Sequence, residues 1–174
     1  MPPIPVADLA DRCRPIEFLL VDVDGVIAID DRGVETKHFH VRDGGGIALW
    51  RKAGKRAAIL SGRSAPLVDR RAAELGMAPV IQGAAEKGGP FRDLLGALGL
   101  DARQVCYMGD DLADLPVLAA AGLAACPADA APEAIQLAHL VTQAPGGRGA
   151  VREVVEVILK SQGVWEDLVA GYRS

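Results

Sequence analysis

Short aliphatic runs alternate along the chain with longer segments whose apolar residues recur at helical spacing. Such uninterrupted runs are typical of strands covered on both faces, and they occupy residues 18–21, 57–60, 79–81, 105–108, 123–125 and 140–141. Helices are predicted over residues 44–53, 64–75, 87–98, 112–121 and 149–161. The repeated strand-then-helix order predicts an α/β fold with a parallel, doubly wound sheet.

The segment between the first strand and the first helix has a different pattern. The polar turn Asp30-Asp31-Arg32-Gly33 separates the apolar run 26–29 from the segment 34–41. This pattern predicts a short β-hairpin over residues 26–41 that projects from the end of the first strand.

Composition narrows the class of protein. The 174 residues suit one domain, and 50% hydrophobic content argues against disorder. The net charge of −4 provides no basic field for nucleic acid. No apolar run is long enough to span a membrane, and the N-terminus does not resemble a signal peptide. The three cysteines have neither disulfide-scaffold nor zinc spacing. We therefore expect a reduced, cytoplasmic protein with neither nucleic acid nor membrane as a partner.

Polar side chains follow four of the predicted strands at the point where each strand ends. They are Asp22 and Asp24 after the first, Ser61-Gly62-Arg63 after the second, Lys87 after the third, and Asp110, Asp111 and Asp114 after the fourth. The carboxyl ends of parallel strands share one rim, so we expect these groups to converge. Clustered carboxylates repel one another unless a cation lies among them, and oxygen ligands suit Mg²⁺.

A cation, a carboxylate, a hydroxyl and a lysine together favour phosphoryl transfer. One aspartate can attack phosphorus and form an aspartyl-phosphate, which splits the reaction into two steps. The cation and the lysine neutralise charge on the phosphoryl oxygens. A second aspartate two residues further on can protonate the leaving alcohol and then deprotonate the hydrolytic water.

The segment Asp22-Val23-Asp24-Gly25-Val26, together with Ser61, Lys87 and Gly109-Asp110-Asp111, resembles the four motifs of the haloacid dehalogenase superfamily. The resemblance implies that Asp22 is the nucleophile and Asp24 the general acid and base. It also implies that Ser61 binds a phosphoryl oxygen and that Lys87 pairs with the nucleophile and the phosphate. The implied Mg²⁺ ligands are Asp22, the backbone carbonyl of Asp24, and Asp110. Asp111 would support them through water or Lys87.

A closer resemblance covers residues 16–163 and leaves an N-terminal extension, 1–15, and a tail, 164–174. The segments 41–44, 61–64, 82–83, 109–112 and 146–153 are similar to those of the 3-deoxy-D-manno-octulosonate 8-phosphate (KDO 8-phosphate) phosphatase family. This resemblance implies a Rossmann-like fold without a cap domain and a Mg²⁺-dependent phosphatase of lipopolysaccharide biosynthesis. It further implies a homotetramer in which a neighbour's C-terminal segment covers each site.

Substrate identity leaves alternatives open. Phosphatases of nine-carbon sialic-type acid 9-phosphates share this scaffold, although the Ser61-Gly62-Arg63 form is more similar to the octulosonate branch. Arg42 and Arg63 are candidate ligands of a substrate carboxylate, because guanidinium binds carboxylate in a bidentate manner. Each could equally lie on a solvated face. Arg148 lies in a Gly-Gly-Arg-Gly turn; the resemblance implies that it binds substrate by inserting near a neighbour's site, and the alternative is a flexible loop before a helix.

Two further classes fit part of the pattern. A phosphorylatable signalling receiver also combines aspartates, a hydroxyl, a lysine and Mg²⁺, but its phosphoacceptor normally lies on a middle strand. A non-catalytic scaffold could retain the fold. Asp114 has two interpretations as well, because it could support the site or cap a helix.

Overall fold

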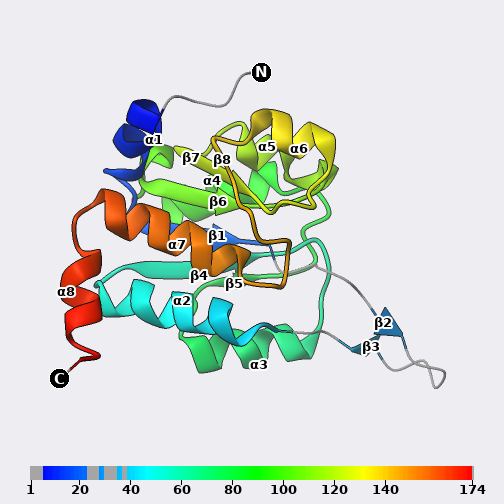
Figure 1. Ribbon diagram of the computed structural model, residues 1–174. Helices are drawn as coiled ribbons and strands as arrows, with labels where there is room; N and C mark the ends of the chain where they lie inside the picture. The colour runs from blue at the N-terminus through cyan, green and yellow to red at the C-terminus, as the bar shows by residue number, and fades with distance from the viewer. Residues whose placement is uncertain (1–5, 23–27, 30–34, 37–38, 174) are drawn as a thin grey trace.

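The computed structural model describes residues 6–22, 28–29, 35–36 and 39–173, and a six-stranded parallel sheet forms its middle layer (Figure 1). The strand order is β5-β4-β1-β6-β7-β8. The strands are β1 (Phe18–Val21), β4 (Arg56–Leu60), β5 (Val80–Ile81), β6 (Val105–Met108), β7 (Leu123–Cys126) and β8 (Leu140–Val141). The predicted α/β fold with a doubly wound parallel sheet is therefore confirmed.

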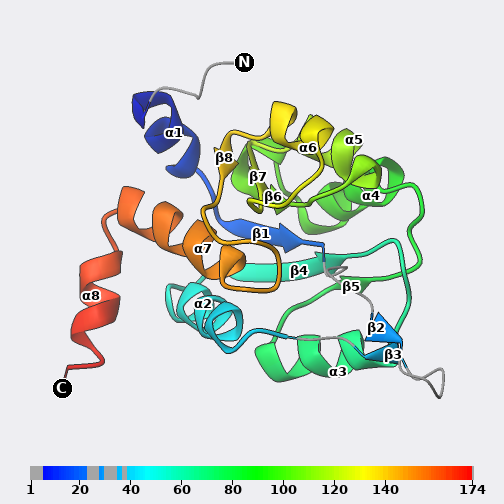
Figure 2. The same ribbon diagram turned by 45° about the vertical axis from the view of Figure 1, so that its right-hand side comes forward.

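Helices cover both faces of the sheet (Figure 2). One face carries α2 (Val41–Lys52), α3 (Pro66–Leu75) and α7 (Ala150–Ser161), with α1 (Val6–Cys13) and α8 (Trp165–Ala170) beside α7. The other face carries α4 (Gly88–Leu98), α5 (Leu115–Leu118) and α6 (Pro132–Leu137). None of the helices in the described residues is long and apolar enough to cross a membrane.

Alternate residues of each central strand enter opposite cores. In β1, Leu19 and Val21 pack on the α2–α7 side, whereas Phe18 and Leu20 pack on the α4–α5 side. All four are buried, which explains why the strand reads as a continuous apolar run. The same alternation in β6 directs Tyr107 to the α4–α5 side.

The helix predicted over residues 44–53 begins earlier in the structure, where it is α2. We expected it to start at residue 44, but α2 starts at Val41. The triple glycine at 44–46 interrupts the hydrophobic pattern, yet it lets α2 pack closely on α7, because a Cβ at Gly46 would lie 3.0 Å from Arg152 Cα. Tertiary packing thus outweighs the weak helix propensity of glycine.

Other predicted boundaries also change. The segment expected as a helix over 112–121 is a 3₁₀ turn, η2 (Leu112–Asp114), followed by the short α5; another 3₁₀ turn, η1 (Ala102–Gln104), precedes β6. The helices α1 and α6 were not predicted. Within the proposed extension and tail, α1 buries Cys13 and α8 buries Leu168 against the core.

The predicted hairpin is confirmed where the structure describes it. Strands β2 (Ala28–Ile29) and β3 (Glu35–Thr36) pair antiparallel, with Ala28 opposite Thr36. The predicted end of the hairpin at residue 41 is wrong, because Val41 already belongs to α2. The rest of the predicted hairpin, except residues 39–41, lies outside the described residues.

Candidate active site

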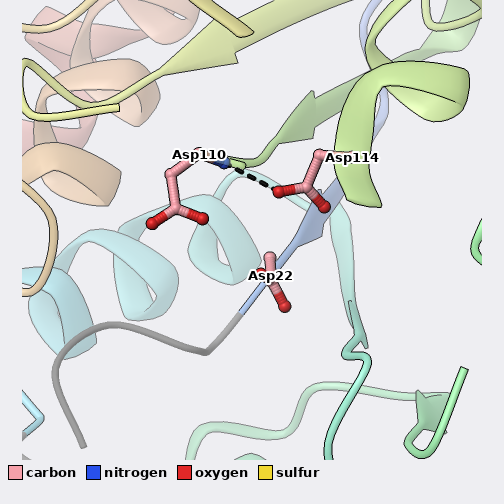
Figure 3. A group of neighbouring side chains, drawn as sticks. All are labelled: Asp22, Asp110 and Asp114. Carbon is pink, nitrogen blue, oxygen red and sulfur yellow. Dashed lines mark hydrogen bonds between the residues drawn. The ribbon is translucent and has the colours of Figure 1, made fainter. Parts of the chain in front are cut away.

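Two neighbouring strands bring the first two site aspartates together. Strands β1 and β6 pair in register, with Val21 opposite Met108, and the Asp22 N–H donates to the Met108 carbonyl at 2.9 Å. Asp22 therefore leaves β1 beside the turn that carries Asp110. Carboxylate oxygens of Asp22, Asp110 and Asp114 lie within 4.8 Å of one another (Figure 3).

Lys87 lies between two of these carboxylates. Its side chain is 2% exposed, and Nζ lies 3.1 Å from Asp22 Oδ2 and 2.6 Å from Asp114 Oδ1. Burial alone would lower the pKa of Lys87, but the charges of Asp22 and Asp114 and their hydrogen bonds raise it above its ordinary value. Lys87 is therefore a buried ammonium that directs positive charge at Asp22.

Asp114 is the fully buried centre of the hydrogen-bond network. Its Oδ1 accepts from Lys87 at 2.6 Å and from the Tyr107 hydroxyl at 2.5 Å. Its Oδ2 accepts from the backbone N–H groups of Asp110 at 2.8 Å and Asp111 at 3.0 Å. A carboxylate has about four acceptor positions, so these four donors fill them. Asp114 thus supports the site and leaves the role of cation ligand to Asp22 and Asp110.

Close packing around Asp114 requires glycine at position 109. A Cβ at Gly109 would lie 2.4 Å from Asp114 Cγ, a distance that real Cβ atoms do not adopt. The Gly109-Asp110-Asp111 segment can therefore wrap around the Asp114 carboxylate only without a side chain at its first position.

The carboxylate of Asp110 is destabilised by burial and by the negative charges around it. Burial, followed by the charges of Asp22, Asp114 and Asp111, raises the pKa of Asp110 to about 7, although Lys87 partly opposes this. A divalent cation between Asp22 and Asp110 would relieve the repulsion, and carboxylate oxygens are the ligands that Mg²⁺ prefers. The donor set therefore fits a hard divalent cation.

Ser61 directly follows β4, in a tight turn beside Lys87. Its hydroxyl is buried, donates to the Arg63 carbonyl and accepts from the Arg63 N–H, both at 3.2 Å. A Cβ at Gly62 would lie 4.0 Å from Lys87 Cε, which places this turn against the lysine. The Arg63 side chain itself is exposed.

A cavity of about 350 Å³ opens beside the carboxylates. Asp22, Asp110 and Arg148 line it, and much of the remaining wall is apolar, including Ile47 and Met108. A second cavity, of about 290 Å³, lies next to it and is lined by Arg42 and again by Arg148. Arg148 therefore joins the two cavities.

Two expected site residues differ from their predicted surroundings. Asp111 is exposed, and its carboxylate accepts from the Leu112 N–H at 2.8 Å, so it caps η2. Within the described residues, the carboxylates that contact Lys87 belong to Asp22 and Asp114 rather than to Asp111. Asp24 lies outside the described residues.

Sequence reasoning missed three residues that the structure brings to the site. Tyr107 contacts Asp114, whereas Arg71 and Asp43 line the larger cavity. A hydroxyl within the otherwise apolar run 105–108 was the available signal for Tyr107. Asp43 lies in the segment 41–44, for which the resemblance gave no role to the aspartate, and Arg71 lies within a predicted helix, where charged residues usually face solvent.

Asp22 and Asp110 lie at the carboxyl ends of adjacent strands of a doubly wound sheet, and a buried lysine pairs with Asp22 and Asp114. This arrangement defines a haloacid dehalogenase-like hydrolase. In agreement, residues 73–153 match the haloacid dehalogenase-like hydrolase family. The 3-deoxy-D-manno-octulosonate 8-phosphate phosphatase of Yersinia pestis is 43% identical over 91% of this chain and 88% of its own. The enzyme of Escherichia coli K12 is 43% identical over 90% of this chain and 86% of its own. The chain belongs to this family of phosphatases.

Solved structures agree with this assignment. The Moraxella catarrhalis 3-deoxy-D-manno-octulosonate 8-phosphate phosphatase, in complex with magnesium ion, phosphate ion and KDO, superposes with a TM-score of 0.93 at 35% identity. It covers 97% of this chain and 99% of its own. A probable YrbI family phosphatase from Pseudomonas syringae also gives a TM-score of 0.93 at 40% identity. The superposition covers 97% of this chain and 98% of the Pseudomonas chain.

Proposed function

We propose that this chain is a Mg²⁺-dependent phosphomonoesterase that hydrolyses KDO 8-phosphate through an aspartyl-phosphate on Asp22. The contact that carries this proposal is the placement of the Lys87 ammonium 3.1 Å from Asp22, with Asp110 beside them. The substrate follows from the 43% identity to the KDO 8-phosphate phosphatases and from the KDO-bound Moraxella structure.

In the first step, an Asp22 oxygen attacks phosphorus and the bond from phosphorus to the sugar oxygen breaks. Asp24 gives the leaving oxygen a proton. In the second step, Asp24 takes a proton from water, the water oxygen attacks phosphorus, and Asp22 is released with inorganic phosphate. Lys87 stabilises charge on the phosphoryl oxygens and on Asp22 throughout, and Ser61 binds one phosphoryl oxygen.

Asp22, the Asp24 carbonyl and Asp110 would hold the cation. When bound, Mg²⁺ supplies positive charge that neutralises the phosphate and relieves the repulsion between Asp22 and Asp110. The raised pKa of Asp110, about 7, supports this assignment because it reports an uncompensated negative cluster.

The substrate carboxylate would bind on the arginine side of the cavity. Arg148 lines the cavity that contains Asp22 and also the neighbouring one that contains Arg42. A guanidinium in this position suits a carboxylate at the far end of an extended sugar acid whose phosphate lies at Asp22. Gly62 lies beside Lys87. Gly62 and the exposed Arg63 that follows it would contact the part of the sugar nearest the phosphate.

The proposal includes assembly into a cytoplasmic homotetramer. Val41 is 84% exposed, and Phe39, two residues before it, and Leu67 on α3 are exposed apolar residues as well. Exposed apolar residues that gather on one side of a small domain favour an interface between copies. Sedimentation velocity of the full chain tests the stoichiometry.

A substrate panel tests the activity. We expect the highest kcat/KM with KDO 8-phosphate when phosphate release is compared with sialic acid 9-phosphate, hexose phosphates and p-nitrophenyl phosphate. Asp22→Asn, which keeps the shape of the nucleophile, should abolish turnover on all of them. Preference for the nine-carbon acid would replace the substrate and keep the mechanism. Absence of turnover by a folded, Mg²⁺-binding protein would favour the scaffold or receiver interpretation.

A further inference from the structure

The Tyr107 hydroxyl reaches the site from strand β6, on the side of the sheet that α4 and α5 cover. Tyr107 is fully buried on β6, and its ring packs in the α4–α5 core. The hydroxyl donates to Asp114 Oδ1 at 2.5 Å, the same oxygen that accepts from Lys87 at 2.6 Å. A neutral donor and a cation therefore share one oxygen of a buried carboxylate.

We propose that Tyr107 is a positioning residue of the phosphatase reaction, whose hydroxyl fixes the Asp114 carboxylate so that this one group orients both Lys87 and the Asp110 turn. The role of Tyr107 in catalysis rests on the proposed phosphatase function. The Tyr107 hydroxyl donates to Asp114, so Tyr107 acts on the site through that carboxylate.

The two oxygens of Asp114 serve different parts of the site. Oδ1 holds Lys87, which in turn lies 3.1 Å from the nucleophile Asp22. Oδ2 holds the backbone N–H groups of Asp110 and Asp111, and thus the turn that carries a cation ligand. Rotation of this carboxylate would disturb Lys87 and the Asp110 turn together.

Tyr107 is suited to prevent that rotation. Burial and the charge of Asp114 raise the pKa of the Tyr107 hydroxyl, so it remains a proton donor. Its ring is held between packed strands and helices, so the hydroxyl has a defined place. Because the hydroxyl is neutral, it donates a hydrogen bond to Asp114 without placing a second positive charge beside Lys87.

Tyr107→Phe separates this role from simple core packing, because it keeps the ring and removes the hydroxyl. We expect kcat for KDO 8-phosphate to fall about tenfold, which corresponds to the loss of about one well-placed hydrogen bond in the transition state. KM should stay within about twofold, because the phosphate and sugar ligands remain in place.

A matched control is Trp50→Phe. Trp50 is also fully buried, and its Nε1–H donates to the Arg56 carbonyl at 2.8 Å, at the opposite end of β4 from Ser61. The control should lower Tm at least as much as Tyr107→Phe and leave kcat at the wild-type value. Equal kcat in Tyr107→Phe and wild type, with only a fall in Tm, would overturn the proposal.

Calorimetric titration of Mg²⁺ provides a readout that does not need turnover. We expect Tyr107→Phe to weaken Mg²⁺ binding severalfold, because the Asp110 turn is held through the same carboxylate, whereas Trp50→Phe should bind Mg²⁺ like wild type. If the wild-type protein turned over no phosphate ester, the proposed function would fail and this titration would still decide the role of Tyr107. Unchanged Mg²⁺ affinity in Tyr107→Phe would then overturn it.

Discussion

The Asp43 carboxylate on α2 accepts hydrogen bonds from the backbone N–H groups of Gly149 and Arg152, each at 3.0 Å. These groups belong to the start of α7, more than a hundred residues further along the chain. The first N–H groups of a helix lack partners within the helix, so Asp43 satisfies two of them from a neighbouring helix. The contact joins two helix starts that border the cavity next to Asp22.

Replacement of Asp43 by alanine should therefore destabilise the fold. Asp43→Ala removes both hydrogen bonds to α7, and we expect the free energy of unfolding to fall by about 1–2 kcal/mol. Urea unfolding followed by circular dichroism measures this change. Asp93→Ala, at an exposed position of α4, is the control and should stay within about 0.5 kcal/mol of wild type. Equal effects of the two substitutions would contradict the role of Asp43.

The adjacent aspartates Asp110 and Asp111 should respond differently to substitution. Asp110→Asn removes a charged ligand, so we expect the Mg²⁺ concentration for half-maximal activity to rise more than about tenfold. Asp111→Asn should change it less than about threefold, because the exposed Asp111 caps η2 and asparagine also caps helices well. Phosphate release at varied Mg²⁺ separates them. A large effect of Asp111→Asn would instead place its carboxylate near the cation.

The arginine side of the cavity gives a substrate-dependent prediction. Arg148→Ala should raise KM for KDO 8-phosphate about tenfold through loss of a charge-assisted contact to the carboxylate. KM for p-nitrophenyl phosphate, which has no carboxylate, should change little. Arg42→Ala, which affects only the neighbouring cavity, should have a smaller effect. Steady-state kinetics with both substrates provide the measurement, and equal increases in KM would count against carboxylate recognition.

His139 should make stability depend on pH. Its Nδ1 accepts from the Ala124 N–H at 2.9 Å, which requires a neutral ring, and burial followed by the charge of Arg12 lowers the pKa of His139. The unfolded chain therefore binds the proton more readily. This contribution to stability is complete above the unfolded pKa, about 6.5, and is lost as pH falls toward the folded pKa.

His139→Asn tests that expectation, because the asparagine oxygen can accept the same hydrogen bond without titrating. Wild type should lose more Tm than His139→Asn between pH 8 and pH 5.5, as measured by thermal unfolding. Other groups titrate over this range in both proteins, so the difference isolates His139. An identical pH dependence would show that the His139 ring does not change its charge on unfolding in this range.

The sequence predicts the positions that local rules govern and misses those that depend on distant contacts. Asp22 and Asp110 could be placed together because parallel strands end at a common rim, and the apolar runs identify those strands. The start of α2 at Val41 could not be predicted, because Gly44 to Gly46 break the apolar pattern and the helix depends on packing against α7.

The role of Asp114 shows the same limit at the level of one side chain. Its spacing after Asp110 fits both a cap and a site residue, and the structure gives it both: it accepts from the Asp111 N–H and from Lys87. Only the three-dimensional fold brings Lys87, the residue before α4, and Tyr107 from β6 to a single carboxylate.

The register of β1 and β6 has a consequence for how such an enzyme can diverge. Hydrogen bonds between these strands, continued by the Asp22 N–H to the Met108 carbonyl, set the spacing between Asp22 and the Asp110 turn. The β2–β3 hairpin lies beyond that ladder. Residues can therefore be inserted, deleted or exchanged in the hairpin while Asp22 and Asp110 keep their separation. A change in the surface that the hairpin presents thus leaves the distance between the nucleophile and the cation ligand unaltered.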